Sequence, residues 1–251
     1  MNEVESVKST VSAQFSRTAE NYAQSAVHSA GDDLELMVRA AAPLGHESLL
    51  DVGTGAGPVL RAFSGKVASL TGLDFAEPML ERAAAVAPEA RLVKGDAESL
   101  PFPDASFDIV TCRVCAHHFP DFARAIREAA RVLRPGGLYL LDDNYAPEDP
   151  ALGAFLNGFE QTRDPGHVAE RPLSEWRRLF ESAGLTFEVV LETKKTLDFE
   201  WWINMARTPP DAVARLREQF AVASLAARAA FGIHDAPLRF DLPWAIAIGR
   251  K

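Results

Sequence analysis

Short apolar runs and longer amphipathic segments alternate along most of the chain. Apolar runs stand at Ser48–Val52, in VASLTGLD ending at Asp74, and in FDIVTCR ending at Arg113. Such runs are typical of parallel strands that are covered on both faces, because those strands have no solvent side. Each is followed by a segment with apolar residues at helical spacing. This alternation predicts βαβ units and a parallel sheet with helices on both faces.

The pattern gives an order of elements along the whole chain. Residues from about 1 to 45 are predicted to be helical and to end at Pro43 and Gly45. The later segments are a helix over 172–185, strands over 186–199 and 238–250, and between those strands a helical insert at about 199–232. The strands expected before them are 48–52, 67–74, 90–96, 107–113 and 137–143, and the helices expected between them start at 58, 76 and 122.

Composition narrows the choice of partner and compartment. The 251 residues include 35 acidic and 26 basic side chains, for a net charge of -9. An acidic surface repels phosphate backbones, so nucleic acid is not expected as a partner. The N-terminus has no apolar core of a signal peptide, and no apolar run reaches the roughly 20 residues of a membrane span. A cytoplasmic protein without stable membrane insertion is expected, and the oligomeric state stays open.

The most informative motif is Asp51-Val52-Gly53-Thr54-Gly55-Ala56-Gly57, directly after the first predicted strand. Alternate glycines let the backbone turn tightly and admit a ligand close to the main chain. A nicotinamide or flavin site normally has GxGxxG spacing. Here the spacing is GxGxG, and the Asp51 carboxylate suits a cationic ligand better than a pyrophosphate, which it would repel.

Two further acids are predicted at the same sheet edge. Asp74 ends the second strand, where a carboxylate can accept both hydroxyls of a ribose. Asp96 ends the third strand, where it can accept a hydrogen bond from the exocyclic amine of an adenine. Ligands of open α/β sheets bind at the carboxyl ends of the strands. The three acids therefore predict an adenosyl site there.

The chain resembles the class I S-adenosylmethionine-dependent methyltransferases, in particular their UbiE-type (methyltransferase type 11) branch. The resemblance covers about residues 48 to 144 and rests on LLDVGTGAGPVL, GLDFAEPML, VKGDAESLPFPDASFDIVTCRVCAHHF and REAARVLRPGGLYLLDDN. It implies a Rossmann-like α/β fold with a mostly parallel seven-stranded sheet, helices on both faces and a small helical cap. It also implies an N-terminal lid at 1–45 in front of one domain at 46–251.

The same resemblance implies that the chain transfers a methyl group from S-adenosylmethionine to a small-molecule acceptor, quinone-like or otherwise aromatic, and leaves S-adenosylhomocysteine. The residues that it implies for cofactor binding are Tyr22, Asp51, Gly53, Thr54, Gly55, Asp74, Phe75, Met79, Asp96, Ala97 and Arg113, with Phe15 and Tyr22 closing over the cofactor.

Methyl transfer needs alignment, exclusion of water and, for a protonated nucleophile, a base. His117 and His118 follow the fourth strand at the rim of the predicted pocket. We take His118 as the candidate base, because the intrinsic pKa of histidine is close to neutral. Asp143, after the fifth strand, is the second catalytic candidate, and plain packing is the alternative for both.

Other residues leave alternatives open. Arg163, His167 and Arg171 can hold an anionic substrate or lie at the surface, which we favour. Trp201 and Trp202 can shield an apolar substrate or pack in a core. Cys112 and Cys115 have CxxC spacing but straddle a strand end, so ordinary burial is preferred and no metal site is expected. As a whole, a nicotinamide-dependent oxidoreductase or a non-catalytic S-adenosylmethionine-binding protein remain the competing functions.

Overall fold

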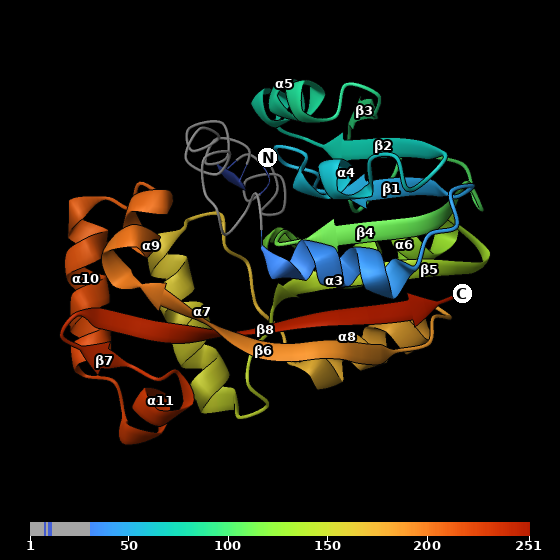
Figure 1. Ribbon diagram of the computed structural model, residues 1–251. Coiled ribbons are helices and arrows are strands. Elements are labelled where there is room, and N and C mark those ends of the chain that lie inside the picture. The colour runs from blue at the N-terminus through green and yellow to red at the C-terminus, as the bar shows by residue number, and fades with distance from the viewer. Residues whose placement is uncertain (1–7, 9, 12–30) are drawn as a thin grey trace.

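The computed structural model describes residues 8, 10, 11 and 31–251. Its centre is a single sheet with the order β3-β2-β1-β4-β5-β8-β6, and a short strand, β7, pairs with β8 off this path. Five neighbouring strands are parallel, and β8 runs antiparallel between β5 and β6. Figure 1 shows the carboxyl ends of β1, β2 and β4 pointing toward the side of the molecule where α7, α9 and α10 lie.

The strands are short in the parallel half and long in the antiparallel half. Their bounds are β1 Ser48–Val52, β2 Ser69–Asp74, β3 Arg91–Lys94, β4 Phe107–Arg113, β5 Leu133–Asn144, β6 Glu188–Asp198, β7 His234–Asp235 and β8 Leu238–Arg250. The helices are α3 Asp32–Ala41, α4 Pro58–Phe63, α5 Glu77–Val86, α6 Phe122–Val132, α7 Pro150–Arg163, α8 Leu173–Ser182, α9 Phe199–Met205, α10 Pro210–Ala221 and α11 Leu225–Ala230, with a 3-10 turn at Ala116–His118.

Successive strand residues bury themselves on opposite faces of the sheet. Leu49 of β1 packs with Met37 of α3 and Phe63 of α4, whereas Leu50 packs with Ile126 of α6 on the other face. All of these side chains are fully buried. This double covering explains why the strands are apolar without alternation, because both faces are removed from water.

The helical insert at about 199–232 shares a third core with α7. Helices α7, α9, α10 and α11 and the start of β8 enclose an aromatic cluster that is separate from the two cores beside the sheet. Phe159 of α7 lies at its centre, with ring centroids 5.1 Å from Phe220, 5.5 Å from Phe240 and 5.7 Å from Trp202. Edge and tilted contacts of this kind add stability beyond the buried area.

The predicted fold is confirmed, since the sheet is mixed α/β with seven strands on its main path and helices on both faces. The predicted bounds of β1 and β4 agree residue for residue with the structure. Helix α7 was not predicted, and its two internal glycines, Gly153 and Gly158, explain why the signal was weak. The strand predicted at 137–143 begins earlier, because α6 ends at Val132 and β5 follows directly from Leu133 to Asn144.

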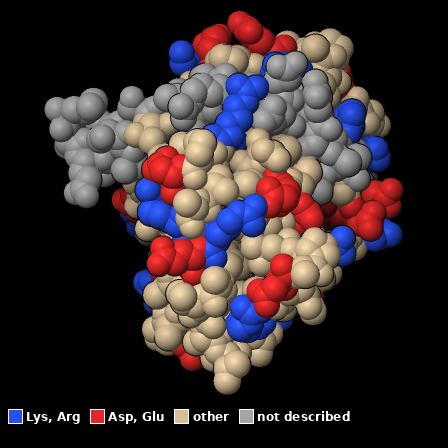
Figure 2. All heavy atoms as spheres, turned by 90° about the vertical axis from the view of Figure 1, so that its left-hand side faces the viewer, with Lys and Arg blue, Asp and Glu red and all other residues tan. Residues whose placement is uncertain are grey.

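Two features of the structure relate to the predictions about membranes and nucleic acid. Within the described residues, no helix is both long enough and apolar enough to cross a membrane. Figure 2 faces the end of the molecule where the insert lies, and there acidic and basic side chains are interspersed with neutral ones instead of forming a continuous basic patch. The prediction of an N-terminal lid at 1–45 stays a prediction, because much of that range lies outside the described part.

Candidate active site

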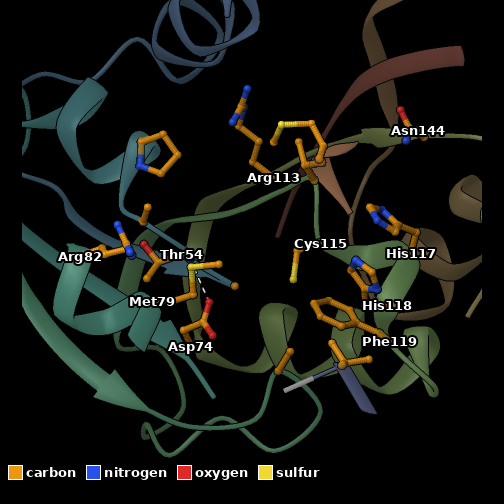
Figure 3. Close-up of a pocket in the computed structure, with 18 of the residues that line it drawn as sticks. Thr54, Asp74, Met79, Arg82, Arg113, Cys115, His117, His118, Phe119 and Asn144 are labelled. Carbon is orange, nitrogen blue, oxygen red and sulfur yellow. Dashed lines mark hydrogen bonds between the residues drawn. The ribbon is translucent and has the colours of Figure 1, made fainter. Parts of the chain in front are cut away.

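A cavity of about 350 Å³ opens at the carboxyl ends of β1, β2 and β4 and extends to the insert. Figure 3 shows Thr54, Asp74 and Met79 on one side and His117 and Asn144 on the other. The glycine-loop side is lined by Gly53, Thr54, Gly55, Ala56, Leu73, Asp74, Phe75, Met79 and Ala97, and the insert side by Asn144, Glu160, Arg163, Lys195, Leu197, Trp201, Trp202, Met205, Leu242 and Trp244. The cavity therefore joins a backbone-rich half to an aromatic half.

The glycine loop after β1 depends on backbone conformations that other residues rarely adopt. Gly53 has φ +69, and a Cβ placed there would clash with the side chain of Cys115. Gly55 has φ +51 and open space where its Cβ would stand. Glycine is needed at Gly53 for the close approach to Cys115, which lies just beyond the end of β4, and it leaves room at Gly55 beside the cavity.

Asp74 holds this loop from the end of β2. Its carboxylate accepts hydrogen bonds from the Gly55 amide at 2.9 Å and from the Ala76 amide at 2.9 Å. Burial raises the pKa of Asp74 above its ordinary value, although these amide hydrogen bonds favour the carboxylate. Each oxygen keeps further lone pairs, so the side chain can accept more hydrogen bonds from a ligand.

The other two acids predicted at this edge do not line the cavity. Asp51 is buried beneath the loop and accepts a hydrogen bond from the Thr111 hydroxyl at 2.7 Å, and burial raises its pKa to about 6. Asp96 lies two residues beyond the end of β3, where its carboxylate binds Lys8 Nζ at 2.7 Å. Asp51 therefore supports the end of β1 beneath the loop and does not face a ligand in the cavity.

A buried ion cluster joins α3 to the centre of the sheet. Arg113, at the end of β4, lies 2.7 Å from Asp33 of α3 and 3.3 Å from Asp142 of β5. Asp142 also accepts a hydrogen bond from the Trp244 indole. Lys195 of β6 lies 3.6 Å from the same Asp33 oxygen. Burial raises the pKa of Asp142 well above its ordinary value, although the Arg113 charge acts in the opposite direction.

A histidine–aspartate pair lies at the opposite end of the cavity. His117 Nδ1 is 2.7 Å from Asp143 Oδ1, and the other Asp143 oxygen accepts the amide hydrogens of Ala116 at 2.7 Å, Cys115 at 3.2 Å and His117 at 3.3 Å. Asp143 is 1% exposed and does not line the cavity. It therefore fixes the turn and the ring of His117, and the expectation that Asp143 itself faces a substrate is revised.

The pair has a pronounced effect on protonation. Burial alone would lower the pKa of His117, but the Asp143 carboxylate outweighs it and raises that pKa to about 9. In return, and against the effect of its own burial, the imidazolium holds the pKa of Asp143 below its ordinary value. At neutral pH the pair is therefore an imidazolium beside a carboxylate, and His117 Nε2 makes no hydrogen bond within the described residues.

His118, the predicted base, has a different environment from that of its neighbour. It lines the cavity, but its Nδ1 lies 2.9 Å from the Gly166 carbonyl oxygen. Burial and the positive charge of His117 lower the pKa of His118 to about 4, so its ring is neutral at physiological pH. The sequence predicted a histidine at this rim. It did not show which of the two histidines pairs with Asp143, because Asp143 comes from another strand.

The insert supplies residues that the sequence left undecided. Arg163 of α7 lines the cavity, pairs with Glu160 at 3.1 Å and lies 4.9 Å above the Trp202 ring, so the surface interpretation of Arg163 is wrong. His167 is 7% exposed and stacks on His117. Trp202 belongs both to the cavity lining and to the insert core.

Of the residues predicted to bind the cofactor, the structure brings most to one cavity. Gly53, Thr54, Gly55, Asp74, Phe75, Met79, Ala97 and Arg113 all line it. Tyr22 and Phe15 lie outside the described residues. Lys195, Glu160 and Trp244 were missed, because no local motif marks them and only the pairing of β5 and β6 with β8 brings Lys195 and Trp244 to the cavity.

Several known methyltransferases are similar in sequence to this chain. A family model described as a methyltransferase domain matches residues 50–141. The uncharacterized methyltransferase YcgJ of Bacillus subtilis is 42% identical over 246 residues, which cover 94% of this chain and 97% of that protein. A demethylmenaquinone methyltransferase of Staphylococcus aureus is 40% identical over 109 residues, 41% of this chain and 45% of that enzyme.

Solved structures agree in fold. The crystal structure of B. subtilis YcgJ superimposes with a TM-score of 0.85 at 39% identity, over 88% of this chain and 98% of that one. The matched sequence includes the glycine loop, Asp74 and the strand that carries Arg113. From its sheet order, its glycine loop and this similarity along almost its entire length, the chain belongs to the class I S-adenosylmethionine-dependent methyltransferases.

Proposed function

We propose that the chain transfers the methyl group of S-adenosylmethionine to a small, aromatic or quinone-like acceptor bound between the glycine loop and the insert. The observation that carries this proposal is the single cavity in which the loop, Asp74 and His117 all meet. The tryptophans on its insert side suit a flat apolar body. The partial similarity to a demethylmenaquinone methyltransferase supports an acceptor of this class.

The glycine-loop half fits this cofactor in shape and charge. The open space beside Gly55 admits a ligand against the main chain, and the remaining lone pairs of Asp74 suit ribose hydroxyls. Phe75 and Met79 offer apolar surface for an adenine, and Ala97 lines the same half, where its amide would bind a ring nitrogen of the adenine. When bound, S-adenosylmethionine supplies an electrophilic methyl group on a sulfonium.

The histidine pair provides the chemistry on the acceptor side. Asp143 orients His117 through Nδ1 and leaves Nε2 to the cavity, so the imidazolium can stabilise an acceptor oxyanion by a charge-assisted hydrogen bond. In its neutral form the same Nε2 can take a proton from an acceptor hydroxyl. Apolar side chains such as Leu242 and Met205 help to exclude water from this half.

Titration calorimetry with S-adenosylhomocysteine tests the cofactor half. We expect the wild type to bind and Asp74→Ala to lose about 1–3 kcal/mol of binding free energy, through lost charge-assisted hydrogen bonds. Glu81→Ala is the matched control, since Glu81 is an exposed acid of α5 outside the cavity lining. Heat release with NAD but not with S-adenosylhomocysteine would instead favour an oxidoreductase.

A transfer assay then tests the acceptor half. The wild type is incubated with S-adenosylmethionine and a panel of phenols, quinols, amines and carboxylates, and released S-adenosylhomocysteine is measured. Turnover of an aromatic acceptor that falls in His117→Asn supports the proposal. Tight cofactor binding without turnover of any acceptor would favour the non-catalytic binding protein.

A further inference from the structure

The insert side of the cavity combines apolar surface with a few buried polar atoms. We call it the insert wall and define it by Asn144, Glu160, Lys195, Leu197, Trp202 and Trp244, all of which line the cavity. These residues come from β5, α7, β6, α9 and β8. None of them belongs to the glycine loop, so under the proposed function the insert wall lies on the acceptor side.

Four polar atoms of the insert wall have no hydrogen-bond partner among the described residues. They are Asn144 Oδ1, Glu160 Oε1, Lys195 Nζ and Trp202 Nε1. Asn144 is 8% exposed and Glu160 is 2% exposed, so bulk water does not replace a partner. Buried polar groups are normally hydrogen-bonded, and exceptions that gather in one cavity indicate a ligand that completes them.

Lys195 carries the charge of this group. Its ammonium lies 3.0 Å from the centre of the Trp244 ring and 3.6 Å from an Asp33 oxygen, beyond hydrogen-bond reach. Arg113 already binds that Asp33 oxygen at 2.7 Å. Lys195 Nζ is therefore the more distant of the two cations at that oxygen, and no described side chain accepts a hydrogen bond from it. Its ammonium can donate hydrogen bonds to an anion that enters the cavity.

Because Lys195 is buried, a nearby anion would change the pKa of its ammonium. Loss of water lowers the pKa of Lys195, even though Asp33 and Asp142 raise it. A further anion near the ammonium would offset this desolvation, since an ion pair is stronger where water is excluded. A cationic amine at the same position would be repelled by the Lys195 ammonium.

We propose that Lys195 selects the acceptor by binding an anionic oxygen, phenolate, enolate or carboxylate, on an apolar body that lies against Trp244, Trp202 and Leu197. Asn144 and Glu160 accept hydrogen bonds from a donor group of the same molecule. This inference rests on the proposed function, because it assigns the acceptor class of that site. Lys195 is then a specificity residue. It binds the same acceptor as the histidine pair, but its role is separate from theirs.

Equilibrium binding of small probes to protein saturated with S-adenosylhomocysteine tests the inference. The probes are 4-nitrophenolate, 4-nitrobenzoate, neutral 4-nitroanisole and the cation 4-nitrobenzylammonium, at a pH where the phenol is ionised. We expect at least one anionic probe to bind the wild type about tenfold or more tightly than the neutral one, and the cation to bind most weakly. Which anion is preferred distinguishes a phenolate site from a carboxylate site.

Two lysine variants separate a specific role from a general charge effect. Lys195→Met should reduce the preference for the anion to less than about threefold, because only the ammonium is removed. Lys194→Met is the control, since Lys194 precedes Lys195 on β6, is exposed, and binds the Ala230 carbonyl at 2.7 Å. It should keep the preference.

The results that overturn the inference are distinct from those that overturn the proposed function. Equal binding of anionic and neutral probes by the wild type, or a preference that survives in Lys195→Met, would eliminate Lys195 as the selecting residue. Unchanged affinity of Lys195→Met for S-adenosylhomocysteine shows that the variant is folded. Failure of the wild type to bind S-adenosylhomocysteine at all would count against the proposed function itself.

Discussion

Replacing Asp143 by asparagine should shift the titration of His117 across the physiological range. The substitution keeps the shape of the side chain and one oxygen for the Ala116 amide, but it removes the negative charge that lies 2.7 Å from His117 Nδ1. In the wild type this charge overcomes the effect of burial and holds the pKa of His117 at about 9. In Asp143→Asn only Glu170 and Glu160 oppose burial, and each raises the pKa of His117 less than Asp143 does, so that pKa should fall well below about 9.

The size of the effect follows from the two pKa values. The pKa of His117 is about 9 in the folded chain and 6.5 in the unfolded chain. This difference corresponds to about 3 kcal/mol of folding free energy. The contribution is fully present below pH 6.5 and is lost as pH rises from there through about 9, because only the unfolded chain releases the proton in that window.

Urea unfolding between pH 6 and 9, together with NMR titration of the histidine rings, measures both quantities. The wild type should lose stability across this window, and Asp143→Asn should lose far less. Asp211→Asn serves as the control, because Asp211 is an exposed acid paired only with Arg215 on the same helix. A wild-type His117 that titrates below 7, or a midpoint near 9 that persists in Asp143→Asn, would refute the account of the pair.

Three further predictions concern other parts of the structure. In Gly53→Ala the new Cβ would stand 2.9 Å from Cys115 Cβ, so unfolding free energy should fall by more than the roughly 1–2 kcal/mol of a left-handed backbone alone, and a smaller loss in urea would contradict the close approach. Phe159→Ala should cost about 3–5 kcal/mol of stability, measured thermally, while affinity for S-adenosylhomocysteine stays unchanged. Arg113→Met should cost about 3–5 kcal/mol because Asp33 loses its closest cation, and adding Asp33→Asn should recover part of this; no recovery would argue against the pairing.

The parallel half of the fold could be predicted because its signals are local. The run Ser48–Val52, the glycines after it and the proline that opens α4 each describe a short stretch of chain, and the structure keeps the predicted bounds. The insert was predicted with less detail. Helix α7, which packs against the insert, contains Gly153 and Gly158. The stability of α7 comes from aromatic contacts with segments more than 40 residues away, such as Trp202.

The part of the candidate site that is formed by backbone, the glycine loop, could be predicted from the sequence. The part that depends on pairs of side chains far apart in the sequence could not. His117 and His118 are neighbours in sequence, and only the carboxylate of Asp143, 26 residues later, makes their charges differ. Lys195 reaches the cavity because β8 pairs with both β5 and β6 and sets Leu242 opposite Lys195. Pairing of this kind leaves no local pattern in the sequence.

The separate aromatic core of the insert has a consequence for how this molecule can diversify. Its rings pack on one another and not on the layers that support the glycine loop. A mutation that reshapes Trp202 or its neighbours would thus alter which acceptor fits while leaving the donor half intact. Natural or engineered variants of this chain can be expected to change specificity first through the lobe around Phe159, with the nucleotide-facing half inherited unaltered.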